Sequence, residues 1–208
     1  WLWDMANEIR PLMPMVYYHV WDNYPYPMFN KLNYESNDVI LTISKVTDDI
    51  VSTVAPTVTR KYMPHAVNSE YFKKLPEDKI SELKKQYVNA DEKDKFVFFW
   101  NNRNARRKQS GSVVWWFNEW AEKVGPDNVR LIMHTDPHDP QGQNLESLLR
   151  ELGALDGRIQ MSKNKVEASE LALLYNMADC TINISDAEGF GLEKNGLGLV
   201  LNHLQKLS

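Results

Sequence analysis

An acidic, glycine-rich turn at residues 185–192 (SDAEGFGL) has the composition of a ligand-binding loop. It follows the apolar run 180–184, which predicts a buried parallel strand. The turn would then lie at the carboxyl edge of a sheet, where open α/β sheets bind ligands. Glu188 could accept hydrogen bonds from hydroxyl groups, and Gly189 and Gly191 would let a ligand approach the backbone. If a helix follows, its free N–H groups would suit a diphosphate. The alternative is an ordinary strand-to-helix turn with an exposed acid.

A second group of candidate residues is His134, Asp136, His138 and Asp139, which are adequate ligand types for a metal ion. The surrounding stretch, residues 131–145, also contains Asp-Pro and Pro-Gln-Gly sequences. These are typical of a connector between a strand and a helix. We favour the connector and predict no metal site.

Alternating strands and helices must position these residues. The apolar patterns predict strands at residues 15–20, 38–43, 57–62, 95–100, 128–134, 157–161 and 179–184, and helices at 45–54, 77–89, 112–124, 143–152 and 167–177. Such alternation predicts right-handed crossovers and parallel sheets. Asn164 and Glu167 have the spacing of a capping box, which predicts the start of the last helix.

The acidic turn resembles the donor site of the retaining glycosyltransferases of family 4, which carries a Glu-Gly-Phe-Gly-Leu sequence. The resemblance implies that Glu188 holds sugar hydroxyls. It also implies that Gly189, Phe190, Gly191 and Leu192 bind the donor near its sugar and phosphate.

Basic residues after the 95–100 strand extend the resemblance. In the family this strand ends in an arginine, with a lysine five residues on, and Arg103 and Lys108 match that spacing. The resemblance implies that both contact the donor diphosphate and neutralise the leaving group in place of a metal. Arg106 and Arg107 are interpreted as a solvated basic turn.

His19 ends the strand predicted at residues 15–20. Many family members have a histidine at the matching strand end, so the resemblance implies that His19 contacts the sugar from the opposite lobe. The alternative is a packed histidine, which is the more common role of a lone one. Residues 62–68 resemble the family's interdomain segment, although Ala66 replaces its usual glycine.

The resemblance covers residues 12–192 and implies an α/β fold of the GT-B type, with parallel Rossmann-like sheets in two incomplete lobes. The remainder of the acceptor-side lobe would occupy residues 1–75, and a truncated nucleotide-sugar lobe residues 76–208. Gly196 departs from the family, which has a second glutamate there. We expect the middle part of a longer enzyme, and the alternative is a divergent small protein. We also expect self-association through uncovered sheet edges.

The implied activity is a retaining transfer of a hexose from a nucleoside-diphosphate sugar, without a cofactor. The acceptor would be a hydroxyl of a carbohydrate, lipid or protein. A sugar-nucleotide epimerase or a phosphorylase on the same architecture is one alternative. A non-catalytic fragment that binds a nucleotide or a partner is the other.

Composition narrows the class of protein. A net charge of −4 gives no basic field for nucleic acid. The single cysteine, Cys180, cannot form an internal disulfide and fits a reducing compartment. No apolar run approaches the roughly 20 residues of a membrane span, and the start lacks a signal-peptide pattern. We expect a cytoplasmic protein, and peripheral attachment to a membrane stays open.

Overall fold

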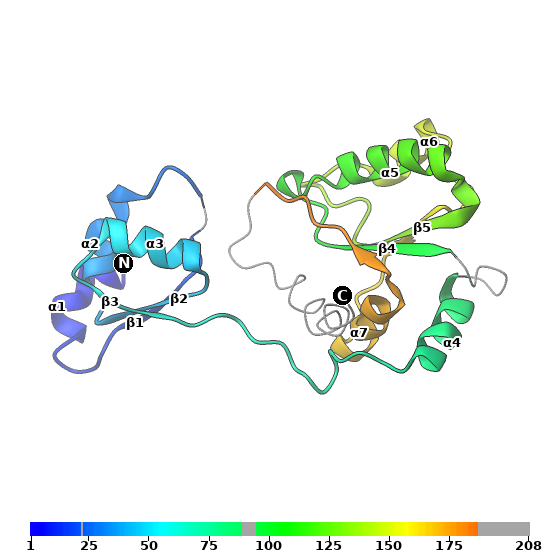
Figure 1. Cartoon of the computed structure of the whole chain (residues 1–208). Coiled ribbons are helices and arrows are strands. Elements are labelled where there is room, and N and C mark those ends of the chain that lie inside the picture. Colours follow the sequence, from blue (N-terminus) through cyan, green and yellow to red (C-terminus); the bar gives the residue numbers. More distant parts are fainter. Residues whose placement is uncertain (22, 89–94, 187–208) are drawn as a thin grey trace. The chain divides into compact units, whose positions relative to one another are not determined.

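The computed structural model describes residues 1–21, 23–88 and 95–186. The described chain forms two compact units, Trp1–Ala66 and Val67–Asp186 (Figure 1). Both units are α/β, and every strand pair in them is parallel. The fold class predicted from the alternating pattern is therefore confirmed.

The first unit is a three-stranded sheet in the order β1-β2-β3, formed by β1 (Val16–His19), β2 (Val39–Thr42) and β3 (Thr59–Tyr62). Helix α3 (Lys45–Val54) crosses from β2 to β3 and begins at Ser44, whose side chain accepts a hydrogen bond from the Thr47 amide. Its apolar stripe packs into a core with β2 and Tyr34. Short helices complete the unit: η1 (Trp3–Met5), α1 (Ala6–Ile9), η2 (Met28–Asn30) and α2 (Lys31–Glu35).

The second unit is a four-stranded sheet in the order β6-β5-β4-β7, formed by β4 (Phe96–Asn101), β5 (Val129–His134), β6 (Ile159–Ser162) and β7 (Cys180–Thr181). Its helices are α4 (Glu77–Val88), α5 (Ser110–Val124), α6 (Leu145–Glu151) and α7 (Ala168–Met177), with short turns η3 (Arg106–Lys108) and η4 (Pro126–Asn128). Helices α5 and α6 cover one face of the sheet, and α4 and α7 cover the other (Figure 1).

Alternating side chains of the central strands supply both cores of this unit. Trp100 and Leu131 pack under α5 and α6. Val97 and Phe99 point to the opposite face, where they pack with Tyr175 of α7. The chain therefore builds the sheet outward from β4 to β6 and then returns to place β7 on the other side of β4. This reversal creates a topological switch point between β4 and β7, and ligands bind at such points in open α/β sheets.

Two local predictions about this unit were wrong. The strand predicted at residues 179–184 pairs only at Cys180–Thr181. It ends there because the Asn183 side chain accepts hydrogen bonds from the amide and hydroxyl of Ser185, which turns the chain out of the ladder. The capping box lies one turn later than predicted from Asn164: Glu167 is the N-cap of α7 and its partner is Glu170.

The short helices of the first unit were not predicted, because no side-chain cap marks the start of η1, α1, η2 or α2. In the described part of the chain, no helix is both long enough and apolar enough to cross a membrane.

Candidate functional site

The predicted basic residues lie at the carboxyl edge of the second sheet, beside the switch point. Arg103 follows the last residue of β4 by two positions, and Lys108 ends the short turn η3. Gln109 takes a left-handed conformation with φ 56°, which ends η3 and lets α5 begin at once. The N-cap residue of α5, Gln109, makes no side-chain capping hydrogen bond. The N-terminal end of the helix dipole adds to the positive potential near Lys108.

Arg103 is held by a carboxylate of the neighbouring loop. Its Nε donates to Asp139 Oδ2 at 2.6 Å, and its Nη2 donates to Asp139 Oδ1 at 3.3 Å. The arginine side chain is 60% exposed, whereas that of Asp139 is 9% exposed. Hydrogen bonding to Arg103 lowers the pKa of Asp139 and raises the pKa of Arg103. The pair therefore remains ionised at neutral pH, with the guanidinium facing solvent.

The same two loops are joined a second time through Asn104, which is fully buried. Asn104 Nδ2 donates to the Gln143 carbonyl at 2.7 Å, and Asn104 Oδ1 accepts from Ser110 Oγ at 2.6 Å. Gly142 packs so closely against Asn104 that a Cβ atom at residue 142 would overlap it. The loop after β5 is thus a rigid support for the loop that carries Arg103.

Lys108 is buried, with 5% of its surface exposed, and its Nζ donates to Asn102 Oδ1 at 2.7 Å. Because an ammonium group only donates, this contact fixes the Asn102 amide with its oxygen toward the lysine. Asn102 Nδ2 is then a buried donor, and it has no hydrogen-bond partner among the described residues. The end of β4 therefore places the Asn102 Nδ2 donor beside the Lys108 ammonium, and both are groups that can bind an anion.

The first residues of the acidic turn lie against these basic residues. The Asp186 amide donates to the Arg107 carbonyl at 2.8 Å. The two Asp186 carboxylate oxygens each lie 2.9 Å from Gln109 Nε2. Glu188, Gly189, Phe190, Gly191 and Leu192 lie outside the described residues. The predicted roles of these five residues stay predictions.

His19 ends β1 in the first unit and is almost fully buried, with 2% of its surface exposed. Its Nε2 lies 2.7 Å from the Tyr34 hydroxyl, and the ring also packs against Tyr17. Nδ1 is buried and has no hydrogen-bond partner in the described chain. Burial lowers the pKa of His19 to about 4, so the imidazole is neutral at physiological pH. Its contact with a sugar stays a prediction.

Each of the four residues considered as metal ligands contacts a different partner. Asp139 pairs with Arg103, and His138 lies 3.3 Å from Glu146. His134 Nδ1 lies 2.9 Å from Ser162 Oγ. Asp136 accepts a hydrogen bond from the His138 amide, as expected for a connector. Among the described residues, no cluster of three or more histidine, cysteine or acidic side chains could hold a metal ion.

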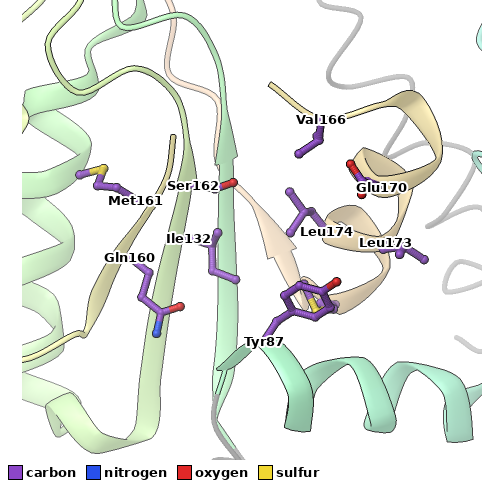
Figure 2. A pocket seen from close by; sticks show the side chains of 10 residues that line it. Tyr87, Ile132, Gln160, Met161, Ser162, Val166, Glu170, Leu173 and Leu174 are labelled. Carbon is purple, nitrogen blue, oxygen red and sulfur yellow. The ribbon is translucent and has the colours of Figure 1, made fainter. Parts of the chain in front are cut away.

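A cavity of about 210 Å³ lies on the α4–α7 face of the same sheet (Figure 2). Ile132 and Leu174 form its apolar wall, while Gln160 and Glu170 add polar groups. Arg103 and Lys108 do not line it. The cavity and the basic edge are therefore separate features of the second unit.

No protein-family model and no curated protein matches the chain. Solved structures do. HepE of Anabaena, in complex with UDP, matches with a TM-score of 0.74 at 18% identity, over 96% of this chain and 55% of HepE. A glycosyltransferase from Rickettsia africae matches with a TM-score of 0.67 at 18% identity, over 89% of this chain and 49% of that one.

The α,α-trehalose 6-phosphate synthase of Burkholderia multivorans matches with a TM-score of 0.64 at 15% identity. That match covers 96% of this chain and 52% of the synthase. The chain spans about half the length of the structures it matches. At these identities the common property is the fold, and it is the Rossmann-like fold of GT-B glycosyltransferases.

Proposed function

We propose that the chain carries the donor site of a glycosyltransferase that moves a hexose from a nucleoside-diphosphate sugar to a hydroxyl acceptor with retention. The observation that carries the proposal is the pair of cations at the carboxyl edge of β4, Arg103 held by Asp139 and Lys108 held by Asn102. The structural likeness to HepE, which was solved with UDP, supports the same ligand class.

The chemistry follows from the leaving group. When the bond between the sugar and the diphosphate breaks, negative charge develops on the diphosphate, and fixed cations lower the energy of that state. The guanidinium of Arg103 is exposed, and its loop is held by the hydrogen bond from Asn104 to the Gln143 carbonyl. Lys108 offers an ammonium beside the uncapped start of α5. In this proposal the two cations neutralise the charge on the diphosphate in place of a bridging metal ion. No protein side chain acts as the nucleophile.

The other predicted residues complete the proposed site. Glu188 would hold hydroxyls of the donor sugar, and the backbone of residues 189–192 would lie near its phosphate. The hydrogen bond between Asp186 and Arg107 supports this placement, because it brings the chain beside the basic turn two residues before Glu188. His19 would contact the sugar as a neutral imidazole only after a rearrangement that exposes its ring, because 2% of its surface is exposed. We also propose that the protein acts in the cytoplasm.

Titration calorimetry with UDP and GDP tests the proposal. A charge-assisted hydrogen bond contributes about 1.5–3 kcal/mol, so Arg103→Ala should weaken nucleotide binding by about tenfold or more. Arg106→Ala is the matched control, because it removes an exposed arginine from the same loop. Equal binding by wild type and Arg103→Ala would remove Arg103 from the site.

Turnover separates the enzyme from the alternative. Incubation with UDP-glucose and GDP-mannose should release the free nucleotide if the chain is catalytic. Nucleotide binding without release would favour the non-catalytic binding module.

A further inference from the structure

We infer that Asp139 is a positioning residue of the proposed donor site, acting on the diphosphate only through Arg103. The inference rests on the proposed function. The sequence pattern pointed to Asp139 as a metal ligand or as a connector residue, and neither role involves the arginine.

The geometry of the ion pair leaves part of the guanidinium open to a ligand. Asp139 accepts from Nε and Nη2 at 2.6 and 3.3 Å. The guanidinium also has N–H groups on Nη1 and a second one on Nη2. Because the side chain is 60% exposed, these donors are accessible. A free arginine of this exposure would sample many rotamers, and the two contacts reduce that freedom before a ligand arrives.

Asp139 can impose this order because it is itself fixed. Its Oδ1 accepts from the Gln141 amide at 2.9 Å, and its carbonyl accepts from the Gly142 amide at 2.9 Å. The Gln141 carbonyl in turn accepts from the Arg106 amide at 3.1 Å. The first two contacts fix Asp139 within its own loop, and the third joins that loop to the one that carries Arg103. Asp139 is therefore a fixed anchor, and the arginine is the group that it orients.

A carboxylate near a diphosphate also repels it, so the sign of the effect is informative. If orientation dominates, Asp139→Asn weakens binding. If repulsion dominates, the same substitution tightens it. The asparagine can still accept from the Gln141 amide through Oδ1, so the loop keeps its turn and loses mainly the charged contact with Nε. We expect UDP binding to weaken by roughly tenfold, which is the low end of the effect of removing the residue that orients a ligand at metal sites.

A double-mutant cycle in the full chain tests the inference, with UDP as the probe and calorimetry as the assay. Asp139→Asn should weaken binding in the Arg103 background and have no further effect in Arg103→Ala. Asp136→Asn is the matched control, because it makes the same change on the same loop at a residue that contacts the His138 amide. Asp139→Glu keeps the carboxylate and should recover part of the affinity. Asp139→Ser, which removes the charge but can still accept from the Gln141 amide, replaces Asp139→Asn if that variant does not fold.

The Arg103 Nε–H signal in NMR spectra gives a reading that needs no nucleotide. Loss of the Asp139 contact should speed its exchange with water, and Asp136→Asn should leave it unchanged. An equal loss of affinity in both arginine backgrounds, or tighter binding by Asp139→Asn, would overturn the inference. A wild-type chain that fails to bind UDP would instead refute the proposed function, and the inference would fall with it.

Discussion

Replacing Gly142 by alanine tests whether the loop after β5 supports the arginine loop. A Cβ atom at residue 142 would overlap the main-chain oxygen and the side chain of Asn104. The backbone oxygen cannot rotate away, so one loop must move. Overpacking of this kind costs about 1–3 kcal/mol. Weakening the hydrogen bond from Asn104 to the Gln143 carbonyl adds about 1 kcal/mol. We expect the free energy of unfolding to fall by about 2–4 kcal/mol.

Gly153→Ala is the matched control. Gly153 has φ +64°, and nothing lies within 4 Å of the position of its added Cβ. Alanine there tests backbone strain without a collision, and it should cost about 1–2 kcal/mol. Urea unfolding followed by tryptophan fluorescence measures both variants, and calorimetry with UDP shows whether the arginine loop has moved. If Gly142→Ala is no more destabilising than Gly153→Ala and binds UDP normally, the loop after β5 does not support the loop that carries Arg103.

Two further predictions concern protonation and metals. The pKa of His19 lies at about 4 in the folded chain and near 6.5 when unfolded, so the unfolded state binds the extra proton between these values. The contribution of the neutral imidazole to the free energy of unfolding is therefore fully present above pH 6.5. It is lost as the pH falls toward 4, and the total loss is about 3 kcal/mol. His19→Gln should flatten the pH dependence of stability in that window, and an unchanged slope would contradict the buried neutral imidazole. Magnesium or EDTA should change neither the melting temperature nor UDP binding, whereas a metal-dependent rise in melting temperature that is lost in His134→Ala would establish a metal site.

The central strands could be predicted from the sequence because their patterns are local. The run 96–100 is apolar and aromatic, and its alternate residues fill the two faces of the sheet. Arg103 and Lys108 could be placed because they follow directly after that strand. The short helices near the N-terminus could not be predicted, since no side chain caps their first turns.

The supporting contacts of the candidate site could not be predicted, because they join residues far apart in the chain. Arg103 and Asp139 are separated by 36 positions, and Gln109 and Asp186 by 77. Only the parallel pairing of β4 with β5 and β7 brings these residues to one edge. His19 was placed correctly at a strand end, but its burial depends on Tyr34, which comes from a helix that was not predicted.

The position of bound UDP tests the central claim most directly. A crystal structure of the chain with UDP should show the diphosphate at the carboxyl edge of β4, with phosphate oxygens about 2.7–3.2 Å from nitrogen atoms of Arg103 and Lys108. UDP bound in the α7 cavity lined by Ile132 and Glu170, with both cations uncontacted, would contradict the claim.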